Sequence, residues 1–239
     1  WQGGDVDMGE GQLWATMNVG AASETEVGTY FAWGETESKT SYGWDNYAWG
    51  ESATTLTKYV LQSTSGTVDN MSILVSSDDA ATAAWGEGWR TPTDAEWLWL
   101  LSNSNMEVEA VDGVTGFRFT SRIEGYTSNS IFIPATGIYD GSSMIVDDND
   151  VSYYWSSSLD PENSANARSN GLSQTYSILN GSTLTSRYKG LPVRAVCTLP
   201  TPVTGIELSK SSLTMELGDN PFTIGATVLP ENSTNKTVK

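Results

Sequence analysis

The chain has 239 residues, of which 38% are hydrophobic and 10% aromatic, so it can form one large or two modest domains with a packed core. Its 12 basic and 29 acidic residues give a net charge of −17, which repels phosphate backbones and anionic membrane surfaces. The hydrophobic and aromatic content argues against disorder throughout, and the negative charge makes nucleic acid and anionic lipid poor candidate partners.

Residue types that the chain lacks narrow its chemistry further. The single Cys197 excludes an internal disulfide framework, and no run of about 18 apolar residues is present for insertion into a bilayer. Histidine is absent, which removes imidazole bases, His-activated nucleophiles and His metal ligands. The chain begins with Trp1 rather than methionine, and we expect a leader to have been removed.

The first predicted elements are a strand and two helices. Residues 13–19 alternate between apolar and polar side chains, which predicts a strand. Ser77 is the expected cap of a short helix that ends at Gly86. Thr93 and Glu96 have the T-x-x-E spacing of a capping box at the start of a second helix. The apolar residues that follow, up to residue 101, predict a buried helix face.

The rest of the chain is predicted as strands, loops and a linker. β-branched and aromatic residues predict strands over residues 116–121, 130–134 and 190–197. The segment 159–188 is dense in Asn, Ser, Thr, Gly and Tyr, which is typical of adaptable recognition loops. A Pro-rich stretch at 199–202 predicts a stiff linker, so we expect two domains, 1–198 and 203–239.

Five motifs follow one another along the first domain, in this order: Tyr30-Phe-Ala-Trp-Gly-Glu35, Trp85-Gly-Glu-Gly-Trp-Arg-Thr-Pro-Thr93, Asn129-Ser-Ile-Phe-Ile-Pro-Ala135, Tyr154-Trp-Ser-Ser-Ser158 and Gly190-Leu-Pro-Val-Arg194. Together they resemble the major paralogous domain of Fibrobacter and Bacteroidetes surface proteins, a branch of the C-type-lectin-like fold. The resemblance implies an α+β class, with two helices packed on small twisted antiparallel sheets. It also implies that the terminal strands, near residues 13–19 and 192–197, lie side by side.

The second domain has a resemblance of its own. Residues 203–239 resemble a bacterial Ig-like group 2 domain, an all-β module that links surface proteins in series. They form only part of one, because an Ig-like sandwich needs about 100 residues. The presence of both resemblances in one chain implies an extracellular or cell-surface setting.

The fold resemblance also carries functional expectations. Its relatives include phage tropism determinants, variable proteins of diversity-generating retroelements and formylglycine-generating enzymes. It implies that the segment 159–188 is displayed as a ligand-facing surface, and it raises the hypothesis that this segment is retroelement-diversified. We therefore predict a non-enzymatic adhesion or ligand-binding module, whose partner is a host or bacterial surface protein or a glycan.

The candidate ligand-binding side chains combine amphipathic area with adjustable hydrogen bonds, which suits recognition without chemistry. They lie in or beside the polar segment, and they are Tyr153, Asn166, Arg168, Asn170, Tyr176, Arg187 and Tyr188.

A calcium site is a separate hypothesis. Asp147, Asp148 and Asp150 are hard oxygen ligands packed into four positions, which suits Ca²⁺. Their spacing differs from that of an EF-hand loop, and a solvated turn is the interpretation that we favour over a metal site. No cofactor is otherwise expected.

Two other functions stay open at this point. The first is an enzyme of the formylglycine-generating or glycosidase type. The former depends on a pair of cysteines where this chain has one, and the latter needs two carboxylates that sequence cannot single out among 29. The second is a purely structural part of a pilus or surface array.

Overall fold

The computed structural model describes residues 3–146, 152–173, 181–198, 203–212, 214, 217 and 223–229. The chain divides into two compact units, Trp1–Thr198 and Leu199–Lys239. No helix among the described residues has the length and apolar character needed to cross a membrane.

The predicted α+β class is wrong. The described residues are 41% strand and 11% helix, arranged as two helices and several small sheets, which makes the chain predominantly β. The two expected helices do form, but they are only 6 and 10 residues long, and strands supply most of the remaining regular structure. Short motifs specify turns and core positions, and they do not specify how many residues enter each kind of element. The helical elements are η1 (Trp44–Asn46), η2 (Ser76–Asp78), α1 (Ala80–Trp85) and α2 (Asp94–Asn103).

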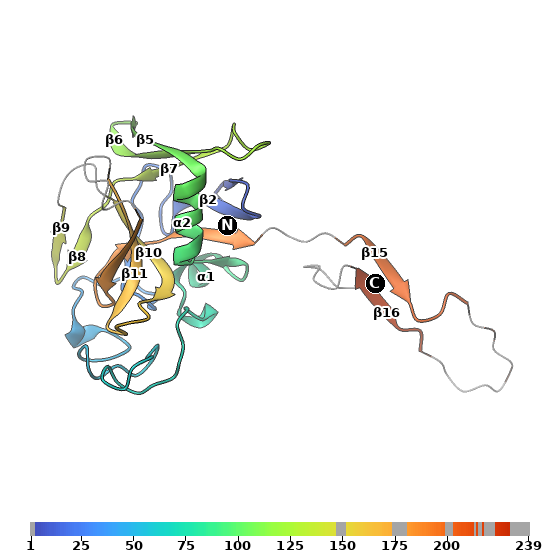
Figure 1. The fold of residues 1–239 in the computed structure, drawn as a ribbon, viewed down its shortest axis with the longest axis horizontal. Coiled ribbons are helices and arrows are strands. Elements are labelled where there is room, and N and C mark those ends of the chain that lie inside the picture. Colours follow the sequence, from blue (N-terminus) through green and yellow to red (C-terminus); the bar gives the residue numbers. More distant parts are fainter. Residues whose placement is uncertain are drawn as a thin grey trace. The chain divides into compact units, whose positions relative to one another are not determined.

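The described strands of the first unit form five sheets. The largest has the order β1-β2-β14-β4, from β1 (Asp5–Asp7), β2 (Gln12–Asn18), β14 (Arg194–Thr198) and β4 (Trp89–Arg90). Two sheets have three strands: β5 (Ser104–Val111), β6 (Val114–Ser121) and β7 (Ser130–Pro134), and β10 (Ser152–Leu159), β11 (Asn166–Leu172) and β12 (Gly181–Ser186). Two sheets are strand pairs: β3 (Tyr30–Phe31) with β13 (Leu191–Pro192), and β8 (Ile138–Asp140) with β9 (Ser143–Ile145). Figure 1 shows α2, in green, lying against β10 and β11.

The first helix begins later than expected. Asp79, not Ser77, caps α1, because its carboxylate accepts hydrogen bonds from the amides of Ala81 and Thr82. Residues 76–78 instead form the 3-10 turn η2. Gly86 ends the helix with a φ of 89°, a left-handed backbone that glycine adopts without steric cost.

The second helix begins as predicted. Thr93 Oγ1 accepts a hydrogen bond from the Glu96 amide at 3.2 Å, and the Glu96 carboxylate accepts one from the Thr93 amide at 2.7 Å. Trp97 and Leu100 are buried, but Leu98 is 41% exposed, so the buried face is narrower than predicted.

The first and last long strands of the first unit pair as expected. β2 and β14 are antiparallel, with Trp14 opposite Val196. Arg194 is fully buried in this region, and its guanidinium donates to Asn18 Oδ1 at 2.8 Å, to the Ala15 carbonyl at 2.9 Å and to the Phe132 carbonyl at 3.0 Å. These contacts give Arg194 a structural role in the core.

Strand β10 contributes side chains to two core clusters. Trp155 packs in one core cluster with Trp33, and Tyr154 packs in another with Trp14 and Trp97. The β10–β11 register shifts between Trp155 and Leu159, so the three serines between them lie at an irregularity of the strand. The residues 72–74 pair with this end of β10.

The described part of the second unit is an antiparallel pair, β15 (Gly205–Leu208) and β16 (Ala226–Leu229), in which Gly205 lies opposite Leu229. Most of the residues between 213 and 222 lie outside the described part of the chain.

Candidate ligand-binding face and cleft

The described parts of the polar segment, residues 159–173 and 181–188, contain the antiparallel strands β11 and β12, which we call the hairpin. β11 is the central strand of its sheet, between β10 and β12, so alternate side chains of β11 point into the domain. Ala167 and Ser169 are fully buried. Ser169 Oγ lies 2.7 Å from both Thr183 Oγ1 and Thr185 Oγ1 of β12, which ties the two strands together on this side.

The opposite side of the hairpin carries the exposed residues. Arg168 lies opposite Leu184, and residues directly opposite in an antiparallel pair share one face. Leu184 is 54% exposed and the Arg168 side chain is 33% exposed. Arg168 Nη1 donates to Ser182 Oγ at 2.8 Å and lies 3.8 Å from Asp94 Oδ2 at the start of α2. We call this surface the hairpin face: it consists of Asn166, Arg168, Ser182, Leu184 and Ser186, with Leu98 of α2.

Arg187 was expected on the ligand face and is instead fully buried. Its guanidinium donates to Tyr47 Oη and to the main-chain carbonyls of Lys58, Tyr59 and Ser164, at 2.9 to 3.1 Å. Four hydrogen bonds offset the cost of taking the charge out of water. Arg187 therefore holds the irregular segment before η2 and is not available to a ligand.

Two other candidate residues are also buried. Tyr153 belongs to the core cluster that contains Trp33 and Trp155. Its amide donates to Thr136 Oγ1, and its carbonyl accepts from the same hydroxyl, both at 3.0 Å. Asn170 has no exposed surface, and neither its Oδ1 nor its Nδ2 has a hydrogen-bond partner among the described residues. Both side chains point away from solvent, so neither contributes to the hairpin face.

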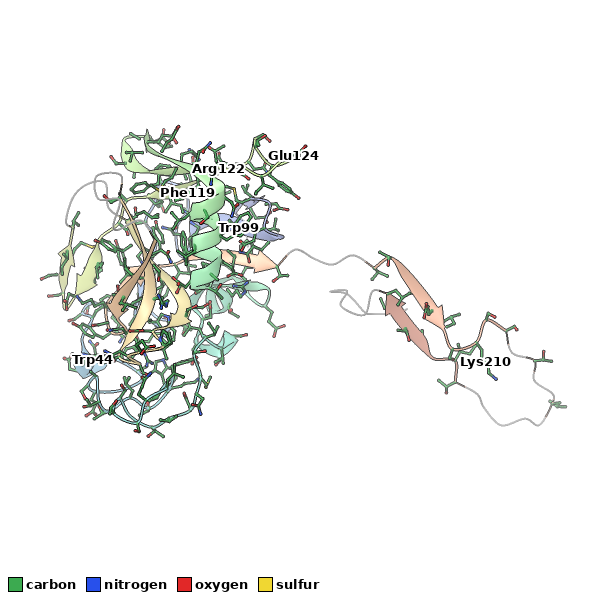
Figure 2. The ribbon with its side chains drawn as sticks, in the orientation of Figure 1. Trp44, Trp99, Phe119, Arg122, Glu124 and Lys210 are labelled. Atoms are coloured by element: carbon green, nitrogen blue, oxygen red, sulfur yellow. The ribbon has the colours of Figure 1, made fainter. Side chains whose placement is uncertain are left out.

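Tyr188 lies elsewhere, in an aromatic cluster. Its ring centroid is 5.0 Å from that of Trp44, and its hydroxyl donates to Asp140 Oδ1 at 3.2 Å. Figure 2 shows Trp44 at the opposite end of the domain from Arg122 and Glu124. Burial, with the nearby Asp140 charge, raises the pKa of Tyr188. Tyr188 is half-buried and makes its contacts with this cluster rather than with Arg168.

The remaining candidates fall outside the described residues. Tyr176 lies there, as do the proposed calcium ligands Asp147, Asp148 and Asp150. Among the described residues, no group of three or more His, Cys, Asp or Glu side chains is placed to hold a metal ion.

A cleft that sequence reasoning missed lies on the other side of the α2 start. Its volume is about 120 Å³, and it opens between the residues 73–76, α1, the start of α2 and β10. It is lined by Ile73, Leu74, Ser76, Asp79, Thr82, Arg90, Thr91, Thr93 and Ser157. The Tyr154-Trp-Ser-Ser-Ser158 motif and the Thr93 cap were both visible in the sequence. Their proximity was not, because it depends on the hydrogen bond from the Ser157 amide to the Pro92 carbonyl.

Both charged residues of the cleft already have partners. Asp79 accepts hydrogen bonds from the amides of Ala81, Thr82 and Thr91, while burial raises its pKa. Arg90 makes a bidentate pair with Glu96, at 2.7 Å through Nη1 and 2.5 Å through Nη2. The hydroxyl of Ser157, by contrast, is buried with no hydrogen-bond partner among the described residues.

One pair of carboxylates has divergent pKa values. Burial, followed by the Glu96 charge, raises the pKa of Glu10 to about 7. Burial would also raise the pKa of Glu96, but its hydrogen bonds to Arg90 and Thr93 outweigh burial and hold the pKa low. Glu96 is committed both to this ion pair and to the α2 capping box, so it is poorly placed to act as a nucleophile.

Comparisons with known proteins add no assignment. The chain matches no family model, no curated protein and no solved structure. The contacts and exposure of the first unit are therefore the basis for a functional proposal.

Proposed function

We propose that the first unit is a non-enzymatic recognition module that binds a surface protein through the hairpin face. The observation that supports this most directly is the exposure of Leu184 and Leu98 around a half-exposed Arg168. Protein interfaces combine an apolar centre with a polar rim, and arginine is enriched among the residues that dominate their affinity. Asn166, Ser182 and Ser186 supply such a rim here.

The rigidity of this face favours binding. Arg168 donates a hydrogen bond to Ser182 and lies near the Asp94 carboxylate. On the buried side of the hairpin, the hydroxyls of Ser169, Thr183 and Thr185 hydrogen-bond to one another across β11 and β12. A surface that is already ordered loses less conformational entropy when a partner docks. The resemblance of the five motifs to those of surface proteins supports an extracellular or cell-surface setting.

The chemistry of the chain favours binding over catalysis. Histidine is absent and Cys197 is the single cysteine. Burial raises the pKa of the Cys197 thiol, which lowers its thiolate fraction and hence its nucleophilicity. Glu96, the carboxylate with the lowered pKa in the Glu10–Glu96 pair, is occupied by Arg90 and the Thr93 amide.

An array of host and bacterial surface proteins and glycans, probed with the full chain, tests the proposal. For a protein ligand that binds, we expect Arg168→Ala to weaken affinity about tenfold or more, because a central interface arginine contributes on this scale. Arg122→Ala is the matched control, since Arg122 is an exposed arginine outside the hairpin face. Equal losses for the two variants, or none for Arg168→Ala, would remove the hairpin face from the proposal.

The enzyme alternative has a specific readout. Turnover of a chromogenic glycoside by the full chain, abolished by Glu10→Gln, would replace the binding proposal with a glycosidase.

A further inference from the structure

The two edges of the β5-β6-β7 sheet differ in their hydrogen bonds. β7 forms one edge, where Arg194 donates to the Phe132 carbonyl at 3.0 Å. Ser152 and Tyr154 donate to the Pro134 carbonyl of the same strand, at 3.0 and 2.9 Å. The edge of the sheet at β7 is therefore partly satisfied by side chains of the core.

β5 forms the other edge and has no such donors. Every second residue of an edge strand directs its N–H and C=O away from the neighbouring strand. No described residue outside β6 makes a hydrogen bond to the main chain of residues 105–111. Figure 1 shows β5 and β6, in green, at one end of the first unit. β5 thus offers a row of free backbone donors and acceptors.

Most of the features that protect edge strands are missing from β5. Proteins protect exposed edges with short strands, bulges, prolines, lysines or covering segments. β1 and β4, the edges of the largest sheet, have only 3 and 2 residues. β5 has 8 residues, pairs with β6 residue for residue, and contains neither proline nor lysine. Its charged side chains are Glu107 and Glu109, so they decide which strands can pair with it.

The two faces of β5 indicate the side chains that a paired strand would carry. Met106 and Val108 are half-buried and pack against the core cluster that contains Phe117 and Phe119. Asn105 and Glu107 are exposed on the opposite face. A strand added at this edge continues both faces, so its residues should alternate between apolar and polar.

The charges on the exposed face favour a basic strand. Arg118 Nε donates to Glu109 at 2.7 Å, and Arg118 Nη1 lies 3.3 Å from Glu24. Glu107 lies opposite Arg118 in register but forms no ion pair with any described residue. Like charges on paired strands destabilise the pair and opposite charges stabilise it. A second copy of β5 would therefore be repelled, and a strand with Lys or Arg would be attracted.

We propose that the free edge of β5 binds an extended segment of a partner protein, in which apolar residues alternate with Lys or Arg. The segment adds to the sheet as a fourth strand, and main-chain hydrogen bonds provide most of its affinity. Glu107 selects the basic side chains. This surface is separate from the hairpin face and does not depend on it.

Amide hydrogen exchange of the full chain, followed by NMR, tests the proposal with the peptide acetyl-(Val-Lys)4-amide as the probe. We expect millimolar or tighter affinity. At a peptide concentration tenfold above Kd, the fast-exchanging amides of β5 should slow by about tenfold, because exchange then requires the free form. The same peptide with every backbone nitrogen methylated keeps its charge and loses its donors, and it should give no protection.

Glu107→Lys is the variant that tests the charge preference. It should weaken the Val-Lys peptide by about fivefold or more, because it replaces an attractive cross-strand pair by a repulsive one. Glu51→Lys is the matched control, since Glu51 is an exposed glutamate outside β5, and it should change the affinity less than twofold. Thermal denaturation should show that Glu107→Lys folds normally, because Glu107 is exposed.

Three results would each overturn the site: exchange of the β5 amides that is unchanged by the Val-Lys peptide, equal protection by the methylated peptide, or equal losses for Glu107→Lys and Glu51→Lys. Arg168→Ala should leave the affinity for the peptide nearly unchanged. A failure at β5 is therefore distinguishable from a failure of the hairpin face.

Discussion

Arg168 lies in the first strand of the hairpin and Arg187 directly follows the second strand, but the former is available to a partner and the latter is part of the core. Arg168 is a half-exposed residue of β11, whereas Arg187 follows β12 and is fully buried. The Arg187 guanidinium lies 5.0 Å from the ring centroid of Trp33 and 5.3 Å from that of Tyr47, within the range of cation–π attraction. Aromatic rings and carbonyls from distant segments thus provide the buried charge with a polar environment.

Arg187→Met tests this structural role. The substitution leaves the buried carbonyls of Tyr59 and Ser164 and the part-buried carbonyl of Lys58 without the Arg187 donor. We therefore expect the free energy of unfolding to fall by about 3 kcal/mol or more. Arg168→Met should cost less than about 1 kcal/mol, because exposed pairs contribute little. Urea denaturation of the two variants measures both values. Similar losses would mean that Arg187 is not the anchor described here.

The raised pKa of Glu10 predicts that the stability of the protein depends on pH. Its pKa is about 7 in the folded chain, against an ordinary value of 4.5, because it is partly buried near Glu96. Between these two values the folded state binds more protons than the unfolded state, so the free energy of unfolding falls as pH rises through this window. The loss is complete above the folded pKa, and solvent screening of this half-buried group limits it to about 1 kcal/mol.

Glu10→Gln should flatten that part of the profile, because glutamine does not titrate. Arg90 and Gln12, which also face Glu10, are unchanged in the variant. The measurement is chemical denaturation of both proteins at several pH values between the two pKa values and just above them. A wild-type protein that gains stability over this range relative to the variant would contradict the assignment.

At the scale of elements, α2 organises both surfaces. Its first turn lies between the cleft, which Thr93 lines, and the hairpin face, where Asp94 meets Arg168. The capping box that begins the helix also includes Glu96, the partner of Arg90. The capping-box sequence at residues 93–96 therefore positions Thr93 at the cleft and Asp94 at the hairpin face.

Thr93→Ala is the variant that tests the cap. We expect it to lower the free energy of unfolding by about 1 kcal/mol, since the Glu96 amide loses its acceptor. Thr93→Ser keeps the hydroxyl and should retain most of the stability. Thermal denaturation followed by circular dichroism compares the two. Equal stability of the alanine and serine variants would show that the cap contributes nothing.

Some elements could be predicted from the sequence and others could not. β7 has the predicted bounds, 130–134, because alternation and residue type are local signals. β5 was missed although Asp112 and Gly113 form the turn that leads to β6, with φ values of 49° and 82°. That Asp-Gly pair was a readable hairpin signal. The predicted strand 190–197 is divided between β13 and β14, which lie in different sheets. The pairing of β13 with β3, Leu191 opposite Phe31, is long-range, and no local pattern shows it.

At the scale of the whole molecule, β14 closes the first unit. It lies between β2 and β4, and thus joins the start, middle and end of residues 1–198 in one sheet. Arg194 adds hydrogen bonds from this strand to β2 and β7. The chain divides into its two units immediately after this strand.

Truncation tests this closure. Removal of residues 199–239 should change the melting temperature of the first unit by less than about 2 °C, because it removes none of the contacts described within the unit. Removal of residues 194–239 should abolish cooperative unfolding, because β2 and β4 lose the strand between them and Asn18 loses the Arg194 donor. A cooperative transition in the shorter fragment would contradict the role assigned to β14.

Caps, turns and alternating side chains act between neighbours in the chain, and for this reason α2, β7 and β2 could be predicted from the residue order alone. The same signals left open which polar side chains face solvent. Arg168, Asn170 and Arg187 come from one polar segment, yet distant elements leave one half-exposed and bury the other two. The Ser157 cleft likewise depends on β10, α1 and α2 meeting. Burial is a property of contacts between remote segments, so folding in three dimensions set the balance of strand and helix and assigned these residues their roles.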